Sequence, residues 1–135
     1  MIAPMPRIAG RYRLEERLSS LGVGAIWIAT DERSGQPVAV RFLERGADDP
    51  ARVALFRASA YAAARLRHPF IARVLDEGID EVGGAFIVTE WIDGTPLGDW
   101  VGSRPPWGFV KAVMTRVCDA LAYIHARGIV HRDVK

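Results

Sequence analysis

The first third of the chain carries short apolar runs that are typical of β-strands. Tyr12 and Leu14 alternate with charged neighbours, which is the pattern of a strand with one buried face. Two apolar runs follow, AIWIAT and PVAVRFL, and the turn-forming segment DERSGQ separates them. This pattern predicts an antiparallel meander of strands over residues 12–19, 25–30 and 37–43.

The next segment has the spacing of a helix. Asp49 suits the capping position ahead of a helix, and Pro50 suits its first turn. Apolar residues then recur at helical spacing over the following turns. The His68-Pro69 pair should end the helix, because the residue before a proline disfavours helical dihedrals.

The second half of the chain predicts two strands followed by two helices. Residues 71–75 and 85–90 have strand character, and the turn-forming segment DEVGG separates them. A short helix is predicted over residues 95–101, and a long amphipathic helix over 107–127 that Gly128 ends. Because strands and helices do not alternate regularly along the chain, this order indicates an α+β fold.

Composition favours a folded protein and argues against several classes of partner. Half of the 135 residues are hydrophobic and a quarter are charged, so the chain can bury a core. The formal net charge is +2 and the arginines are scattered, which argues against a nucleic-acid partner. No apolar run approaches the roughly 18 residues of a membrane span, so we expect no membrane contact within this chain.

The cysteine content and the N-terminal segment indicate the cellular compartment. Cys118 is the single cysteine, which excludes a disulfide framework and a cysteine zinc site. The histidines lack zinc-ligand spacing, so no metal site is predicted in the chain itself. The first residues, MIAPMPRIAG, do not predict a signal peptide. These features favour a reducing, cytoplasmic location.

The segment IVHRDVK, residues 129–135, carries the clearest chemical signal. Phosphoryl transfer requires a carboxylate that orients the attacking hydroxyl and a cation that offsets phosphate charge. With the upstream segments in the same order, the chain from about Arg11 to Lys135 resembles the protein kinase family, in its eukaryotic-type serine/threonine form from bacteria. The resemblance implies that Asp133 accepts or orients the substrate hydroxyl proton and that Lys135 contacts the transferring phosphate.

The same resemblance implies the fold and its division. It predicts a kinase-like N-lobe, which is a five-stranded antiparallel sheet plus one helix. The first helices of the C-lobe follow, and the chain is expected to be truncated in the catalytic loop. The expected parts are a leader over residues 1–10, the N-lobe and hinge over 11–92, and the incomplete C-lobe over 93–135.

Two positions depart from the family where a charged pair is expected. The segment VAVR resembles the third-strand motif V-A-I-K, so Arg41 stands where the family's lysine binds nucleotide phosphates. Arginine is bulkier and forked, so this exchange is not conservative. A surface-facing strand arginine is the alternative interpretation. The partner glutamate falls on Ser59, and residues 51–74 contain no carboxylate that could replace it.

The glycine-rich loop that cradles phosphates in the family is also altered. In the preferred register, G-x-G-x-x-G falls on Ser19, Leu21 and Gly24, and Gly22 is an additional glycine. A register based on Gly22 and Gly24 keeps two glycines but spoils the spacing to VAVR. An ordinary hairpin turn is the alternative interpretation of this segment.

The adenine end of the expected nucleotide site is apolar. By resemblance, Leu18, Ile26 and Ala39 form its roof, Thr89 is a small gatekeeper, and the hinge EWI bonds the adenine edge through its backbone. Ordinary sheet-core packing explains the same apolar residues. The predicted cofactor-binding residues are Leu18, Gly22, Gly24, Ile26, Ala39, Arg41, Thr89, Glu90 and Ile92.

The sequence leaves three hypotheses about function open. In a complete domain, ATP and Mg²⁺ would support phosphoryl transfer to protein hydroxyls. The family's magnesium-binding asparagine and D-F-G aspartate fall beyond Lys135, so this chain alone is expected to be inactive, with ATP binding weak or lost. Arg41, Ser59 and Leu21 favour instead a pseudokinase-type nucleotide- or protein-binding module. A non-functional gene fragment is the third hypothesis.

The expected partners follow from the same reasoning. A kinase domain acts on a protein substrate, which is therefore the first expected partner. In the family the long helix is buried in a larger lobe, so here its apolar face would have few partners. We therefore expect a completing C-lobe chain or self-association.

Overall fold

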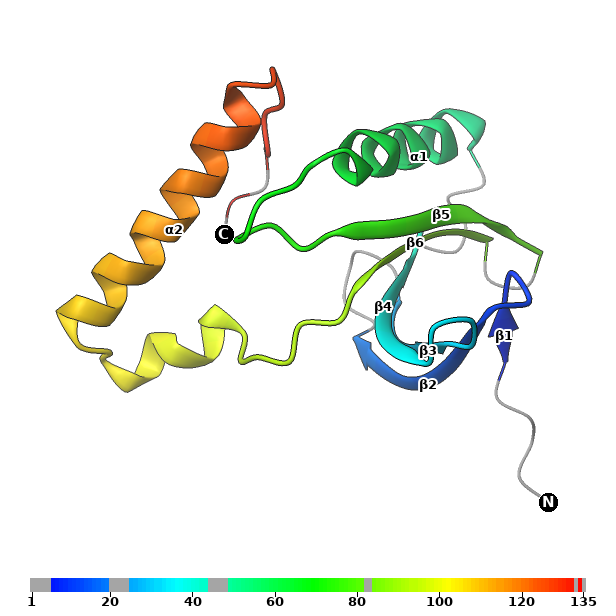
Figure 1. The fold of residues 1–135 in the computed structure, drawn as a ribbon, viewed down its shortest axis with the longest axis horizontal. Coiled ribbons are helices and arrows are strands. Elements are labelled where there is room, and N and C mark those ends of the chain that lie inside the picture. The colour runs from blue at the N-terminus through cyan, green and yellow to red at the C-terminus, as the bar shows by residue number, and fades with distance from the viewer. Residues whose placement is uncertain (1–5, 20–24, 44–48, 82–83, 133, 135) are drawn as a thin grey trace. The chain divides into compact units, whose positions relative to one another are not determined.

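The computed structural model describes residues 6–19, 25–43, 49–81, 84–132 and 134 (Figure 1). These residues form two compact units. Unit 1 comprises the described residues up to Arg65 together with Arg73–Trp91, and unit 2 comprises Leu66–Ala72 and the residues from Ile92 onward. The predicted boundary after residue 92 lies next to this division, but the segment 66–72, which we expected in the N-lobe, groups with unit 2.

Unit 1 contains an antiparallel sheet whose strand order is β1-β2-β3-β4-β6-β5. Within the described residues the sheet has six strands rather than the predicted five, because two residues of the expected leader pair with the second strand. Ile8 of this short strand is buried, so burial of one apolar side chain accompanies the added pairing. The strands are β1 (Arg7–Ile8), β2 (Tyr12–Ser19), β3 (Ile26–Asp31), β4 (Gln36–Phe42), β5 (Val74–Asp80) and β6 (Gly84–Glu90).

The position of strand β5 was predicted wrongly from the sequence. It begins at Val74 and ends at Asp80, whereas the prediction covered residues 71–75. Asp76, Glu77 and Gly78 lie inside the strand, although these residue types are depleted from strands. Pairing of Val74 and of Asp76–Asp80 with the apolar strand β6, with a register irregularity between Val74 and Asp76, overrides this local preference.

One face of the sheet forms the hydrophobic core. Side chains of residues that are directly opposed in an antiparallel pair lie on the same face of the sheet, so the register assigns each strand residue to a face. The row Leu14, Ala29 and Val38 and the row Trp27, Val40 and Val88 belong to the core face. The buried cluster consists of Ile8, Tyr12, Leu14, Ala29, Val38, Val40, Phe42, Phe86 and Val88.

Side-chain hydrogen bonds join the two ends of the strand order. The Ala9 N–H, which follows β1, donates to Asp80 Oδ2 at 2.9 Å. The Tyr12 hydroxyl donates to Asp76 Oδ2 at 2.6 Å. Both aspartates belong to β5, which is at the other end of the order from β1. The sheet therefore curls until its first and last strands meet, as the curved ribbon in Figure 1 illustrates.

A buried carboxylate organises the turn between β3 and β4. Asp31 accepts hydrogen bonds from Arg11 Nε and Nη2, both at 2.8 Å, from the Arg33 N–H at 3.0 Å and from the Ser34 hydroxyl at 2.9 Å. The hydrogen bond from Arg11 holds the pKa of Asp31 well below its usual range. Burial raises the pKa of the neighbouring Tyr12 hydroxyl above its ordinary value. This cluster ties the start of β2 to the end of β3.

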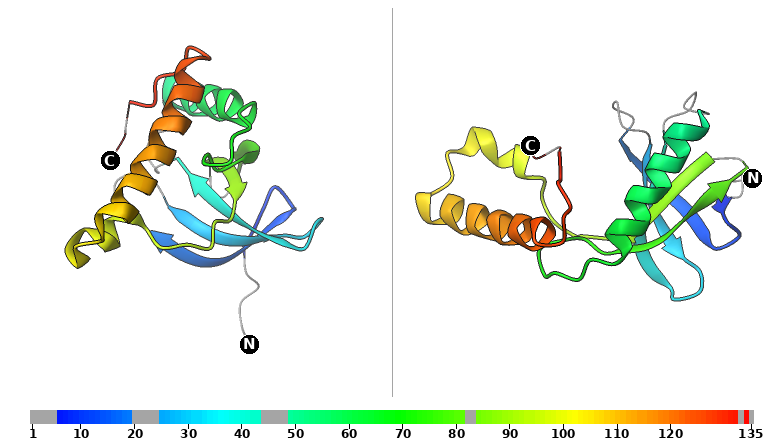
Figure 2. Two further views of the ribbon diagram at one scale, coloured as in Figure 1. Left: turned by 60° about the vertical axis from the view of Figure 1, so that its left-hand side comes forward. Right: turned by 90° about the horizontal axis from the view of Figure 1, so that it is seen from above.

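Helix α1 (Pro50–Ala64) packs against β5 and β6 in unit 1, as the views in Figure 2 show. It begins as predicted, because Asp49 Oδ1 accepts the Ala51 N–H at 2.9 Å. Ala60 is buried, whereas the side chains of Leu55 and Tyr61 are 70% and 66% exposed. The helix is therefore apolar on its outer side as well as on its packed side.

Unit 2 is built around helix α2 (Trp107–His125), which follows the 3₁₀ helix η1 (Leu97–Ser103). The long helix ends slightly earlier than predicted, and Gly128 adopts a φ of 74° just beyond it. The Ile129 N–H donates to the Ile124 carbonyl at 3.0 Å, which satisfies a carbonyl of the last helical turn. Trp107, at the start of α2, is 77% exposed.

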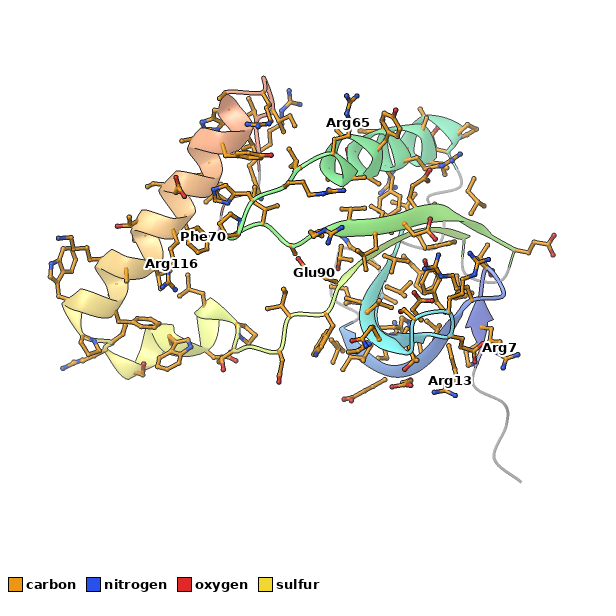
Figure 3. All side chains as sticks on the ribbon, viewed as in Figure 1. Arg7, Arg13, Arg65, Phe70, Glu90 and Arg116 are labelled. Atoms are coloured by element: carbon orange, nitrogen blue, oxygen red, sulfur yellow. The ribbon has the colours of Figure 1, made fainter. Side chains whose placement is uncertain are left out.

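The segment Leu66–Ala72 packs on helix α2 within unit 2. The Arg67 N–H donates to the Tyr123 hydroxyl oxygen at 3.0 Å. The centres of the His68 and Tyr123 rings are 4.9 Å apart. The Arg116 guanidinium lies 5.4 Å from the centre of the Phe70 ring, and Figure 3 labels both residues. The His68-Pro69 segment is thus held against the long helix.

Candidate nucleotide-binding face

Four of the predicted cofactor-binding residues lie on the face of the sheet opposite the core. Ala39 of β4 is directly opposed to Thr89 of β6, and Arg41 is opposed to Ile26 of β3 on its other side. Ala39 and Arg41 are two residues apart in one strand, so their side chains lie on the same face. The structure therefore brings Ile26, Ala39, Arg41 and Thr89 onto one surface, which we call the open face.

The open face combines apolar and cationic character. Ile26, Ala39 and Thr89 are half-buried, whereas Arg41 is exposed. An apolar area next to a cation has the chemistry that an aromatic base joined to phosphates requires. Within the described residues, no ion pair to Arg41 is formed.

The other predicted cofactor-binding residues do not join this group in the described structure. Leu18 is 45% exposed and lies at a register irregularity of β2. Glu90, labelled in Figure 3, accepts the Arg73 N–H at 2.7 Å through its side chain. Ile92 belongs to unit 2 and is mostly exposed. Gly22 and Gly24 lie outside the described residues.

The predicted catalytic residues, Asp133 and Lys135, also lie outside the described residues. The residue just before them is described. Arg132 adopts a φ of 64°, in the left-handed region that residues other than glycine seldom occupy. Such backbone conformations recur at functional sites, where the surrounding structure holds them in place.

Ser59 offers no charge at the position of the family's helix glutamate. It lies in α1, is exposed, and its hydroxyl donates to the Leu55 carbonyl at 2.9 Å, which is a bond within the helix itself. The sequence of α1 contains no aspartate or glutamate that could approach Arg41.

A pair of charged residues that the sequence did not indicate connects α1 to the sheet. Arg57 Nε donates to Glu77 Oε2 at 2.7 Å and Arg57 Nη2 donates to Glu77 Oε1 at 3.0 Å. This two-bond geometry matches the planar guanidinium to the carboxylate. The bond from Arg57 lowers the pKa of Glu77 below its ordinary value. The predicted strand ended at residue 75, so Glu77 was not expected to lie in the sheet. Arg57 and Glu77 also lie too far apart in sequence for a local pattern to indicate their contact.

Two further searches concern metals and membranes. Within the part of the chain that the structure describes, no three histidine, cysteine, aspartate or glutamate residues gather in an arrangement that could hold a metal ion. Among the described helices, none is both long and apolar enough to cross a membrane.

Comparison with known proteins identifies the family. The family model "Protein kinase domain" matches residues 12–135, which is nearly the whole chain. The chain belongs to the protein kinase family. The curled antiparallel sheet with one packed helix, followed by the first helices of a second unit, is thus the kinase fold that the sequence motifs predicted.

Bacterial serine/threonine kinases are among the relatives of this chain. It is 37% identical to serine/threonine-protein kinase PknA of Mycobacterium tuberculosis over 135 residues, covering 95% of the chain and 31% of the relative. It is 38% identical to serine/threonine-protein kinase Pkn1 of Myxococcus xanthus over 127 residues, covering 93% of the chain and 18% of the relative. The chain therefore spans about a third or less of the curated relatives that it matches here.

A solved structure shares the fold of this kinase chain. The crystal structure of the Mycobacterium tuberculosis PknI kinase domain matches with a TM-score of 0.83 and 30% sequence identity. The match covers all of this chain and 56% of the PknI chain. The described strands and helices therefore correspond to roughly the first half of a kinase domain.

Proposed function

We propose that this chain is the nucleotide-binding half of a protein serine/threonine kinase that uses ATP and Mg²⁺ to phosphorylate protein hydroxyls. The observation that carries the proposal is the open face, where Ile26, Ala39 and Thr89 lie beside Arg41. The half-buried apolar residues would hold the adenine ring, and the arginine would neutralise phosphate charge. ATP, when bound, supplies the phosphoryl group that is transferred.

The residues of the HRDVK segment would act at the far end of the nucleotide. Asp133 would orient the substrate hydroxyl and accept its proton, and Lys135 would offset charge on the transferred group. No metal ligand is assigned within residues 1–135, because the family's magnesium-binding residues follow this segment. We therefore expect residues 1–135 alone to bind nucleotide weakly and not to phosphorylate protein.

Thermal unfolding with millimolar ATP and Mg²⁺ tests the site. We expect the wild-type chain to unfold at a higher temperature with nucleotide, because a ligand that binds only the folded state stabilises it. Arg41→Ala and Ala39→Leu should each reduce this increase, since one removes the cation and the other fills the apolar surface. The matched control is Arg33→Ala, which removes an exposed arginine from the β3–β4 turn and should leave the increase intact. An unchanged wild-type melting temperature contradicts the proposal.

A pseudokinase-type module is the second candidate function. The exposed, locally bonded hydroxyl of Ser59 supports it, because the ion pair that marks the active arrangement of the family cannot form there. In this candidate the open face binds nucleotide poorly and the protein acts through contacts with other proteins. Retention of the wild-type melting temperature at millimolar nucleotide, together with a folded chain, favours it over the kinase proposal.

The remaining expectations concern location and partners. We propose a cytoplasmic location, which suits a protein whose single cysteine, Cys118, is an exposed free thiol. The partly exposed apolar residues of unit 2, including Trp107 and Met114, support association with a completing C-lobe segment or with a second copy. A monomeric mass by light scattering at high protein concentration would argue against self-association.

A further inference from the structure

Two residues, Arg41 of the open face and Ser59 of α1, raise the question of what positions helix α1. In the kinase family, a lysine on the strand equivalent to β4 pairs with a helix glutamate, and this pair accompanies the active arrangement. Among the described residues, Arg41 forms no ion pair, and the hydroxyl of Ser59 bonds to a carbonyl of its own helix. The usual connection between the nucleotide cation and α1 is therefore missing.

Glu77 occupies the same row of the sheet as Arg41. Arg41 is opposed to Ile87, and Ile87 is opposed to Glu77 of β5. The side chains of these three residues lie on one face, and about 10 Å separates the outer two strands. The carboxylate on the open face is thus supplied by the sheet rather than by the helix.

Arg57 of α1 binds this carboxylate through two hydrogen bonds, at 2.7 and 3.0 Å. The Glu77 side chain is only 25% exposed and that of Arg57 is 46% exposed, so the pair lies at the edge of the contact between α1 and β5. A forked bond restricts the rotation of both side chains more than a single contact does. It therefore defines where α1 lies along β5.

We propose that Arg57 and Glu77 are the positioning residues of helix α1, in place of the ion pair between a β4 cation and the helix. The inference rests on the proposed function, because it assigns Arg41 to the nucleotide alone. The helix is bound to β5 by a contact in which Arg41 takes no part. The position of α1 is consequently independent of whether phosphate occupies Arg41.

Hydrogen exchange of the α1 amides tests this inference in the 135-residue chain. Arg57→Gln and Glu77→Gln should each speed exchange over residues 50–64 by about threefold, while exchange in β4 and β6 stays unchanged. The double variant should exchange no faster than either single variant, because both substitutions remove one shared contact. The charge-swapped variant Arg57→Glu with Glu77→Arg should restore part of the protection.

The control is an exposed ion pair that does not involve α1. Arg13 Nη2 lies 3.2 Å from Glu15 Oε1 within β2, so Arg13→Gln should leave α1 exchange unchanged. Arg41→Ala should also leave it unchanged, although it weakens nucleotide binding. If Arg41→Ala speeds α1 exchange as much as Glu77→Gln does, or if Glu77→Gln has no effect, the inference is wrong.

Nucleotide addition tests whether the position of α1 depends on occupancy of the open face. Saturating ATP should change α1 exchange by less than about twofold in the wild-type chain, because Arg41 does not reach the helix through a carboxylate. A large slowing confined to α1 contradicts the inference. If ATP does not bind at all, the proposed function fails, but the comparison of Arg57, Glu77 and Arg41 variants without nucleotide still decides the inference.

Discussion

The two faces of the sheet in unit 1 differ in what their residues contribute. On the core face, Tyr12, Val40, Phe86 and Val88 are almost completely buried, and their packing stabilises the fold. On the open face, Ala39 and Thr89 are half-buried and Arg41 is exposed. The departures from the family motif that we identified at described residues, Arg41 and Ser59, affect the open face and its helix. Substitutions should therefore divide into those that change stability and those that change binding.

The largest expected effect comes from the core face. Phe86→Ala should lower the free energy of unfolding by about 3–5 kcal/mol, because it removes a buried ring packed against Tyr12 and Phe42 and leaves a cavity. Urea unfolding measures this change. Leu55→Ala, at a position 70% exposed on α1, is the control and should change stability little. A loss below about 1 kcal/mol in Phe86→Ala would show that the core packs loosely.

Loss of the buried Asp31 carboxylate should have the next largest effect on the free energy of unfolding. Asp31→Asn should destabilise the chain by about 2 kcal/mol, because Arg11 loses the nearer of its two charged partners and the hydrogen bonds from Arg33 and Ser34 are weakened. Urea unfolding at neutral pH is the measurement. Glu32→Gln, which removes the carboxylate of an exposed pair with Arg7, should cost far less. Equal losses in the two variants would contradict the special role of Asp31.

A smaller effect is expected where β5 crosses the core. A Cβ atom at Gly78 would lie 2.9 Å from Phe86 Cζ, and Phe86 is too deeply buried to move freely. Gly78→Ala should therefore destabilise the chain by about 1–2 kcal/mol through overpacking. Gly108→Ala in α2 has open space around its Cβ position and should be neutral or stabilising. Differential scanning calorimetry of both variants separates the two cases.

Acidification should reduce stability through the same carboxylate. The pKa of Asp31 is lowered in the folded state, so its contribution is present above the unfolded-state value near 4 and is lost as pH falls toward the folded-state value. Between pH 5 and pH 3 this loss amounts to about 1 kcal/mol. Urea midpoints at a series of pH values measure it. The pH dependence should be shallower in Asp31→Asn, and an equal slope in both proteins would exclude Asp31 as its source.

The smallest expected effect concerns the open face. Arg41→Lys combined with Ser59→Glu should tighten nucleotide binding by about threefold, because a compact ammonium paired with a helix carboxylate restores the family arrangement. Calorimetric titration with ATP and Mg²⁺ provides the measurement. The combination Arg41→Lys with Ser59→Gln lacks the new charge and serves as control. If both combinations bind equally, the helix carboxylate has no influence on the nucleotide.

Much of the fold could be predicted from the sequence because its signals are local. Asp49 and Pro50 mark the start of α1, and alternation around Tyr12 and Leu14 marks β2. Strand β5 was misplaced because Asp76, Glu77 and Gly78 disguise it, and only pairing with β6 makes it a strand. Strand β1, which was not predicted, is two residues long, and its formation is accompanied by burial of Ile8.

Part of the candidate site could be predicted from local patterns, and part could not. That Ala39 and Arg41 share a face follows from the two-residue period of a strand. That Thr89 and Ile26 join them depends on strand register, which the sequence motifs implied only through the family. The contact between Arg57 and Glu77 joins positions 20 residues apart in two different elements, so no pattern along the chain indicates it.

The meeting of the first and last strands has a consequence for how the protein behaves at high concentration. An unpaired strand edge is a template for pairing with another chain. Strand β5 is the last in the strand order and carries the largely exposed Ile79, but Asp80 and Asp76 are bound to Ala9 and Tyr12. These two hydrogen bonds hold residues of the β1–β2 hairpin next to β5. Release of Ala9 and Tyr12 from this edge would favour intermolecular β-pairing, and because Tyr12 belongs to the buried cluster it would also weaken the core.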